Sequence, residues 1–363
     1  MTENTTPLEN RSEIVFLYDA EDCNPNGNPL SANDKPRVDE TTGEAVVTDV
    51  RLKRYLRDQL DDDDDFNIYI RNPSKAPYEG APGRDALFRR ATDLSDEEVE
   101  EMEADEAADA FLKKAVDVRY FGATCSFSKE FSNKLGGGFP GQFIGPVQFS
   151  HGRSMHTVVT KAESKQLSTV VGSDNEGTTT GDDHDGTEVF EQPQGTFATD
   201  NRLEYALIKF HGVVNENAAQ DTDLSPEDVE RLDSLCWRSL KNQTLTRSKM
   251  GHQPRLYLRV EYATDDFHHG GLDDTIVRAD RAETDGTEYR NITDVPLDVD
   301  GLIAALSRHE EHIDTVHVKC SEYASFELEE DSPEEDSPGT FYDALRDAVG
   351  EEPVNVVDIY DTS

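Results

Sequence analysis

Residues 24–39 read Asn24-Pro25-Asn26-Gly27-Asn28-Pro29-Leu30-Ser31-Ala32-Asn33-Asp34-Lys35-Pro36-Arg37-Val38-Asp39. The apolar run 14–18 before them ends at turn-forming residues, which is typical of a buried strand. After them, residues 50–57 predict a cationic helix, with Thr48 as its N-cap and Asp49 favoured in its first turn. A polar loop of this length inside a compact unit is usually functional or disordered. Its prolines argue against disorder, so we interpret it as a ligand-binding loop.

Further apolar segments extend this strand and helix into an α+β pattern. Strands are expected at 143–149, 203–214 and 255–262, and Ser225-Pro226 is a strong helix start because serine caps and proline fits the first turn. The order strand, helix, strand, strand, helix, strand is the split βαβ, ferredoxin-like order (βαββαβ). We expect one unit over residues 1–363, with insertions at about 61–142 and 150–202 and a C-terminal extension at about 264–363.

The insertions and the tail give more local expectations. His156–Lys161 predicts another strand, and the five aspartates at 61–65 should end the first helix and be solvated. Residues 92–109 hold ten acids and no base, which predicts an exposed acidic helix. Residues 173–192 combine seven acids with many Gly and Thr, which predicts a mobile loop or hairpin tip. The tail from about 264 should hold short elements.

The charge of the chain admits two interpretations. The 363 residues include 77 acidic and 35 basic side chains, a formal net charge of −42. Such a chain could mimic DNA or carry disordered acidic tails. It could instead be adapted to a cytoplasm of high salt, where a carboxylate-rich surface stays solvated and its self-repulsion is screened. The acids are spread over the whole chain among ordinary apolar strands, so we favour the second interpretation, a protein from a halophile.

Cysteine usage and hydropathy predict the compartment. Cys23, Cys125, Cys236 and Cys320 lie far apart without paired spacing, which argues against a disulfide framework or a metal cluster. The N-terminus lacks the basic and apolar regions of a signal peptide. No apolar run approaches the roughly 20 residues of a membrane span. We therefore expect a cytoplasmic protein with no membrane contact.

Basic residues gather in three tracts. Residues 35–57 hold six bases and four acids, residues 113–165 hold eight bases and three acids, and residues 231–259 hold seven bases and one acid. Aromatic residues interleave the second tract, among them Tyr120, Phe121 and Phe127, which can serve either as stacking faces or as core. Ferredoxin-like sheets commonly bind RNA, and single strands need cationic grooves with stacking faces. The alternative is that these bases pair with the many carboxylates elsewhere. Segregation into tracts favours a nucleic-acid groove.

Catalytic motifs are weak by comparison. Gly136–Gly141 matches GxGxxG only literally, because no strand precedes it and Pro140 spoils the helix entry. The histidines of His309-Glu310-Glu311-His312 are one residue too close for a zinc-protease helix. The sequence therefore predicts no catalytic residue, no metal site and no cofactor.

Several motifs together resemble a known family. They are Asn24-Pro25-Asn26-Gly27, Lys35-Pro36-Arg37-Val38-Asp39, Val47-Thr48-Asp49-Val50-Arg51-Leu52-Lys53-Arg54, residues 118–123 (VRYFGA), 144–148 (IGPVQ), 205–207 (YAL) and 210–212 (FHG). This combination, spread over about residues 13–262, is similar to the backbone subunit of Cascade, the RNA-guided CRISPR surveillance complex, in its subtype I-B form. The acid-rich insertions and tail depart from the family pattern, which leaves the insertion boundaries open.

The resemblance implies a RAMP-type modified RNA-recognition fold. Its palm would comprise about 13–60, 143–149 and 203–262, its finger about 61–142, and its thumb about 150–202. Copies would stack in a helical filament along one crRNA and present the guide for pairing with target DNA. Further partners would be a repeat-processing endoribonuclease, a 5′-handle-binding subunit and a large subunit. Such a subunit cuts nothing, whereas type III relatives cleave RNA with a loop aspartate. An acidic scaffold that binds no nucleic acid remains a third alternative.

Residues and resemblance together predict an RNA-binding surface. Cations of the first helix and Arg37 should hold phosphates, and loop amides near Asn26 and Gly27 should donate to phosphate or 2′-hydroxyl oxygens. The predicted RNA-binding residues are Asn26, Gly27, Lys35, Arg37, Arg51, Lys53, Arg54, Arg57, Arg119, Lys129, Lys134, Arg153 and His156.

Overall fold

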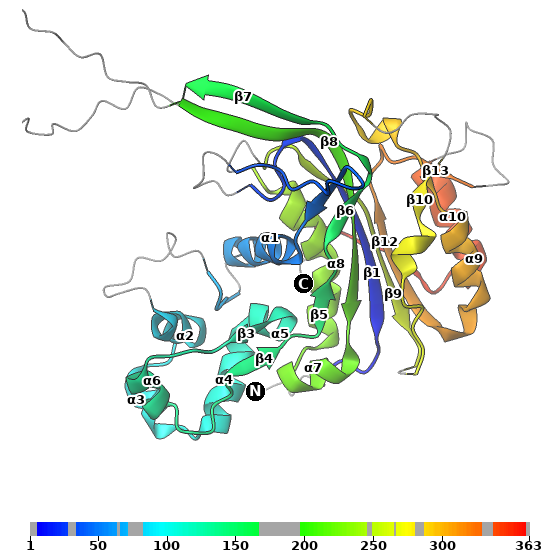
Figure 1. The fold of residues 1–363 in the computed structure, drawn as a ribbon. Coiled ribbons are helices and arrows are strands. Elements are labelled where there is room, and N and C mark those ends of the chain that lie inside the picture. The colour runs from blue at the N-terminus through cyan, green and yellow to red at the C-terminus, as the bar shows by residue number, and fades with distance from the viewer. Residues whose placement is uncertain are drawn as a thin grey trace, which may run out of the picture.

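A nine-stranded sheet forms the centre of the protein in a computed structural model (Figure 1). The structure describes residues 6–27, 34–63, 66–71, 83–166, 197–244, 249–264, 266–279, 287–328 and 337–360. The strand order is β14-β12-β9-β1-β8-β6-β2, and β5 and β7 pair with other parts of β8. The strands are β1 (Ser12–Cys23), β2 (Glu44–Val47), β5 (Val147–Phe149), β6 (Gly152–Thr157), β7 (Thr160–Gln166), β8 (Phe197–Val214), β9 (His252–Tyr262), β12 (Ile313–Cys320) and β14 (Val354–Val356).

Strands β9, β1, β8 and β5 lie side by side in that order, each antiparallel to its neighbour. Helix α1 (Asp49–Asp62) follows β1 in the chain, and α7 (Glu216–Thr222) and α8 (Pro226–Lys241) connect β8 to β9. Mixed helices and strands in this arrangement confirm the predicted α+β class.

The two long helices begin where their sequence signals lie. The Thr48 side chain accepts a hydrogen bond from the Arg51 backbone N–H and caps α1. Ser225 caps α8 in a capping box with Asp228, and Pro226 occupies the first turn. The predicted apolar stripe Val229, Leu232, Cys236 and Leu240 is buried. Both predicted helix starts are confirmed, because a cap is decided by residues three apart in the chain.

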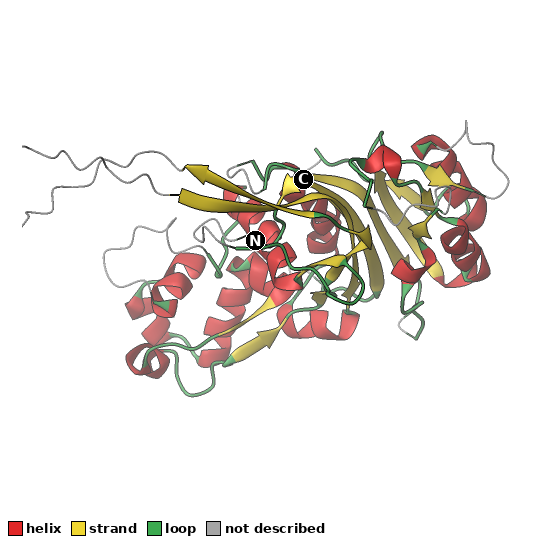
Figure 2. Cartoon of the chain, turned by 45° about the horizontal axis from the view of Figure 1, so that its top comes forward, coloured by secondary structure: helices red, strands yellow, loops and turns green. Residues whose placement is uncertain are grey.

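Alternating residues of β1 face two different cores. Ile14 and Phe16 pack in the core that α1 and α8 cover, whereas Val15 and Leu17 face a second core on the opposite side of the sheet. That second core is closed by the C-terminal extension, and both views show α9 and α10 on that side (Figures 1 and 2). The extension comprises α9 (Asp300–Arg308), α10 (Pro338–Val349), the 3-10 turns Leu272–Thr275, Ile292–Asp294 and Glu310–His312, and strands β10 (Val277–Arg278), β11 (Leu297–Asp298) and β13 (Phe326–Glu327).

The tail holds short elements, as predicted, from the two residues of β10 to the twelve of α10, but their place in the main sheet was not predicted. Strand β12 pairs with β9 and β14 pairs with β12, so the tail also widens the main sheet. These pairings join residues far apart in the chain, which is why local periodicity did not show them. Both faces of the sheet are covered, and the open sheet face on which RNA-recognition folds stack bases is absent from the described structure.

The first insertion has a core of its own, with Phe88, Val99, Ala107 and Phe111 buried in it. The expected acidic helix at 92–109 is two helices, broken at Met102 and Glu103, with one apolar side buried. The elements of the insertion are α2 (Arg84–Thr92), α3 (Asp96–Glu101), α4 (Ala104–Lys114), α5 (Val116–Phe121), β3 (Gly122–Thr124), α6 (Lys129–Lys134) and β4 (Gln142–Ile144).

Two expected strands are each divided. Residues 143–149 split at Gly145-Pro146 into β4, which pairs with β3, and β5, which pairs with β8. The expected strand 156–161 is divided between β6 and β7, and β7 and β8 project as a two-stranded arm (Figure 1). The acidic segment 173–192 lies outside the described residues. No helix in the described parts of the chain is long and apolar enough to cross a membrane.

Candidate nucleic-acid interface

The loop after β1 and the start of α1 form a corner, which we call the loop–helix corner (residues 24–27, 34–48 and 49–55). Asn26 is buried there, and its amide donates to the Val46 carbonyl at 2.5 Å and accepts from the Thr48 N–H at 3.3 Å. Gly27 closes a turn on the Asn24 carbonyl at 2.9 Å. The side chain of Asn26 thereby fastens the beginning of the loop to its end.

Three consecutive carbonyls of the loop accept hydrogen bonds from side chains below them. Lys249 Nζ lies 2.9 Å from the Asn24 oxygen and 2.6 Å from the Pro25 oxygen. The Tyr55 hydroxyl also donates to Pro25, and Arg51 Nη2 donates to the Asn26 oxygen at 3.0 Å. Burial and the repulsion of Arg51 lower the pKa of Lys249 to about 7. Lys249 was only one base of a tract in the sequence, and its contact with residues 225 positions away had no local signal.

Lys35 and Arg37 are the open cations of the corner. Both are exposed, and neither side chain makes a hydrogen bond or ion pair with any residue that the structure describes. Arg153 of β6 is also exposed and pairs with Asp39 and Glu44 at 3.1 Å each. An exposed ion pair of this kind is weak and exchanges readily for another anion. Lys35, Arg37 and Arg153, which lies opposite Val46 of the corner, are therefore the cations here that an external anion can reach.

Lys53 and Arg54, on the same helix, are engaged with nearby groups. Lys53 Nζ donates to the Gln148 side chain at 2.6 Å and lies 3.5 Å from Asp49. Burial lowers the pKa of Lys53, although Asp49 opposes that effect. Arg54 pairs with Asp58 one turn along α1. The charges of Lys53 and Arg54 are therefore partly neutralised by Asp49 and Asp58.

Arg57 and Arg119 join elements inside the protein. The Arg57 Nε lies 2.9 Å from a carboxylate oxygen of Asp117, which is fully buried. Arg119 grips Asp228 with two nitrogens at 2.8 and 2.9 Å and also donates to two carbonyls of α4. Their donors serve the packing of the first insertion against α1 and α8. The structure therefore gives these two arginines internal partners, and their phosphate contact stays a prediction.

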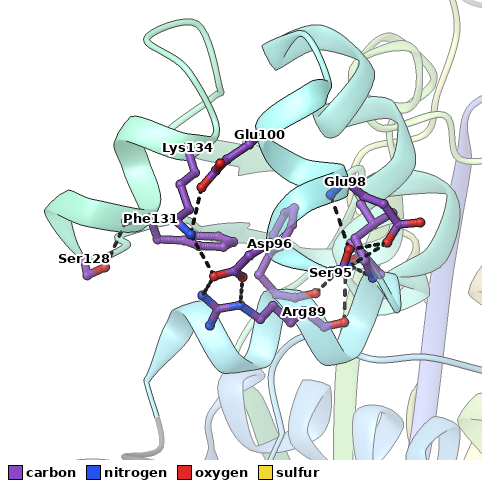
Figure 3. A network of polar contacts seen from close by, with 11 residues as sticks. Arg89, Ser95, Asp96, Glu98, Glu100, Ser128, Phe131 and Lys134 are labelled. Carbon is purple, nitrogen blue, oxygen red and sulfur yellow. Dashed lines mark hydrogen bonds and ion pairs between the residues drawn. The ribbon is translucent and has the colours of Figure 1, made fainter.

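Lys134 belongs to a polar network inside the first insertion (Figure 3). It lies 2.9 Å from both Asp96 and Glu100, and Arg89 also binds Asp96. These contacts raise the pKa of Lys134 and lower that of Asp96. Lys129, also on α6, is exposed and pairs with no described residue. Both lysines lie in the α3–α6 region, apart from α1 and the loop–helix corner in both views (Figures 1 and 2).

His156 is buried between rings and is neutral. Its ring stacks on Tyr205 with centroids 5.7 Å apart, and its Nε2 accepts from the Leu207 N–H at 3.3 Å. Burial lowers the pKa of His156. A neutral histidine with both ring nitrogens near backbone groups offers no charge to a phosphate.

Most arginines of the third basic tract form ion pairs within the protein. Four of the tract's arginines pair with carboxylates. Arg238 and Arg255 bind Asp63 and Asp19 of distant segments, whereas Arg231 binds Asp228 on the same helix and Arg259 binds Asp233 of the same tract. Asp63, expected to be solvated, is thus an internal partner, as is Asp61, which pairs with Arg71. These pairs leave few cations of the third tract for a groove shared by all three tracts. Cations of the first and third tracts, Arg51 and Lys249, meet at the loop–helix corner.

The aromatic residues of the second tract are core. Tyr120 is fully buried with its hydroxyl on the Asp228 carbonyl, and Phe121 is buried under the Arg57 guanidinium. Phe127 packs in a cluster of rings with Phe88. Of the two alternatives that the sequence left open, the structure shows packing for all three. Within the described residues, no three His, Cys, Asp or Glu side chains are placed to hold a metal ion.

Comparison with known proteins agrees with the resemblance that the motifs show. A family model described as CRISPR-associated protein Cas7 matches residues 10–300. A protein of Haloferax volcanii, "CRISPR-associated protein Cas7", is 42% identical over 318 residues, which cover 85% of this chain and 86% of that protein. Two solved chains are also similar. One, from a "CRISPR RNA-guided surveillance complex, pre-nicking", has a TM-score of 0.43 and 13% identity, and covers 93% of this chain and 100% of that chain. The other, from a "CRISPR RNA-guided surveillance complex", has a TM-score of 0.40 and 12% identity, and covers 89% of this chain and 91% of that chain. The family match and the haloarchaeal relative show that this acidic chain belongs to the CRISPR-associated protein Cas7 family.

Proposed function

We propose that this chain is a non-catalytic backbone subunit of a type I-B Cascade, of which several copies coat the spacer of one crRNA. The observation that carries the proposal is the loop–helix corner. Lys35 and Arg37 stand exposed on a loop whose turn is fastened by Asn26 and by three internal donors. A fastened loop with open cations can hold a phosphate at a fixed place without a large loss of conformational entropy on binding.

The fold suggests how the parts would be used. The strands β9, β1, β8 and β5 with α1 and α8 would be the palm, a modified ferredoxin-like RNA-recognition unit. The first insertion would be the finger, and the β7–β8 arm would be the base of the thumb. Since the C-terminal extension covers the second face of the sheet, the RNA would run along the loop–helix corner and the arm instead of across the sheet.

Phosphate contacts suit a protein that must accept any spacer sequence. They fix the position of the strand and carry no base information, so the guide's bases stay available to pair with target DNA. In the molar salt that an acidic halophile inhabits, the Debye length is about 3 Å. Long-range attraction is then screened, and direct hydrogen bonds from Arg37, Lys35 and Arg153 would supply the affinity.

The proposed partners are crRNA, further copies of this chain in a filament, a repeat-processing endoribonuclease, a 5′-handle-binding subunit and a large subunit, all in the cytoplasm. A metal-dependent, RNA-cleaving subunit of the type III kind is the enzymatic alternative, and it would use a loop aspartate such as Asp39. That carboxylate instead accepts from the Thr41 N–H and pairs with Arg153. Incubating the purified complex with Mg²⁺ and a complementary RNA tests this alternative, and cleavage abolished by Asp39→Asn would establish it.

Substitution of Arg37 tests the proposal directly. Arg37→Ala removes an exposed side chain with no partner among the described residues, so folding should be unchanged while the crRNA that co-purifies with the chain decreases several-fold. Arg308→Ala is the matched control, because Arg308 at the end of α9 is also an exposed arginine without a partner among the described residues and lies outside the three basic tracts. RNA retention is measured per mole of protein in high salt. Equal retention by the two variants would refute the role of the corner.

A further inference from the structure

A second concave site lies between α8, the ends of β9 and β12, and the last described residues. It is a pocket of about 360 Å³, and its lining includes Trp237, Lys241, Arg255, Lys319, Tyr323 and Tyr360. Drug-sized and cofactor-sized ligands occupy pockets of about 300–1,000 Å³. The pocket therefore has room for one compact ligand of roughly nucleotide size.

Exposed aromatic rings border this pocket. Tyr323 and Tyr360 are 60% and 74% exposed, and they are the only strongly exposed aromatic side chains in the part of the chain that the structure describes. Elsewhere the described rings are packed in the three cores. Two solvent-exposed rings on one pocket provide flat faces on which a planar group can stack, as bases do on single-strand-binding proteins.

Lysines are also present in the pocket, in a chain of net charge −42. Lys319 makes no hydrogen bond or ion pair with any described residue, and Lys241 Nζ contacts only the Tyr360 hydroxyl, at 2.9 Å, and its ring. Arg255 is held by Asp19 and Ser321, so its charge is already compensated. The two lysine ammonium groups are the cations left for an anionic ligand.

Carboxylates at the rim limit what the ligand can be. Asp358 accepts from the Tyr360 N–H at 2.9 Å, and Glu322 is the neighbour of Tyr323. A densely charged polyanion would be repelled by these two acids. A ligand with one ring and one phosphate satisfies the rings and the two lysines while leaving the carboxylates in solvent.

The pocket opens at the end of the sheet where the loop–helix corner lies. His252, at the start of β9, pairs with Ala20 of β1, and β1 runs on to Cys23 and the loop. Gln253 and Pro254 of the pocket follow His252 directly. A single-stranded nucleic acid bound at the loop–helix corner would thus pass close to the pocket along one edge of the molecule.

We propose that this pocket binds one nucleotide unit of single-stranded nucleic acid, with its base stacked on Tyr323 or Tyr360 and its phosphate on Lys319 and Lys241. The site is distinct from the loop–helix corner, and the inference does not depend on the guide-RNA function. The ligand can be a free mononucleotide or a nucleotide of a strand, since both carry the same base and phosphate.

Trp237 makes the proposal measurable, because it is the only tryptophan of the chain and lines the pocket. The full chain, freed of nucleic acid, is titrated with 5′-phosphorylated pentathymidylate and, separately, with AMP, while tryptophan fluorescence is recorded. Saturable change is expected with the pentanucleotide, and saturation by AMP at similar concentrations would identify a free nucleotide as a sufficient ligand. An unchanged spectrum with both probes would overturn the proposal.

Variants separate this site from the corner. Tyr323→Ala with Tyr360→Ala, or Lys319→Gln, should weaken the fluorescence-detected binding on the order of tenfold, whereas Arg308→Gln on α9 should not. The exposure of the two tyrosines, and the lack of a partner for Lys319 among the described residues, predict unchanged folding, which circular dichroism checks. Arg37→Ala should lower RNA retention and leave the tryptophan response in place, so the two proposals can fail separately. Loss of self-association in the tyrosine variants, with oligonucleotide binding intact, would show a protein contact and overturn nucleotide binding.

Discussion

Replacing Lys249 by methionine should change the pH dependence of folding in a calculable way. Lys249 is 5% exposed and its amine donates to the carbonyls of Asn24 and Pro25, so Lys249→Met removes one of the two hydrogen bonds that each carbonyl accepts. The Gly27 N–H and the Tyr55 hydroxyl remain as the other donors. Each lost hydrogen bond costs about 0.5–1.5 kcal/mol, partly offset because methionine requires no desolvation of an amine. A neutral amine still has two N–H donors, enough for both carbonyls.

The sign of the pH effect follows from the direction of the shift. The pKa of Lys249 is about 7 in the folded protein and 10.5 in an unfolded chain, so the unfolded state binds more protons between these values. The free energy of unfolding of the wild type therefore rises with pH across this window, by about 2 kcal/mol from pH 7 to pH 9 at up to 1.4 kcal/mol per pH unit. The methionine variant lacks this rise.

Urea unfolding in molar KCl at pH 7, 8 and 9 measures the effect as a difference between wild type and variant. The difference should widen with pH by about 2 kcal/mol. Lys129→Met, at an exposed lysine without a partner among the described residues, is the control and should give a difference that does not vary with pH. A constant difference for Lys249→Met would contradict the buried, deprotonating lysine beneath the loop.

Three other substitutions test the architecture. Arg119→Met leaves the buried Asp228 with less compensation and should lower the free energy of unfolding by about 3 kcal/mol in urea; a loss below about 1 kcal/mol would contradict a buried pair. Gly122→Ala places a Cβ 2.2 Å from the Phe143 oxygen at φ +69°, so it should lower the melting temperature, and an unchanged value would show that the turn yields. Burial tends to raise the pKa of Glu13, but hydrogen bonds from side chains and amides hold it well below the ordinary 4.5. Stability that this carboxylate provides is present above pH 4.5 and is lost on acidification below it. Glu13→Gln should therefore make the free energy of unfolding fall less steeply on acidification. An equally steep fall in the variant would refute the lowered pKa of Glu13.

What the sequence allowed us to predict was chiefly local. Helix α1 with its Thr48 cap and α8 with its Ser225 cap were predicted because the signal and the element lie within a few residues. The C-terminal extension was predicted, but its addition to the main sheet was not, since β12 is defined by its pairing with β9 and not by a strong pattern of its own. Long-range pairing is decided by tertiary packing, to which periodicity within a segment is blind.

The candidate site shows the same division. Counting bases by tract could not distinguish Arg37, which is exposed, from Arg119, whose partner Asp228 lies 109 residues away. In a chain with 77 acids, most arginines find a carboxylate once the chain folds. To predict which arginines stay free for RNA, one must know which of them find a carboxylate partner, and only the three-dimensional arrangement shows this. Lys249, which holds the loop from beneath, could not be singled out for the same reason.

The central claim, that the loop–helix corner holds a guide RNA, is tested most directly by sequencing the small RNA that co-purifies with the chain in high salt. The account predicts spacer sequences flanked by CRISPR repeat, retained by the wild type and depleted in Arg37→Ala. Recovery of no RNA, or of cleaved fragments unrelated to repeats, would contradict it.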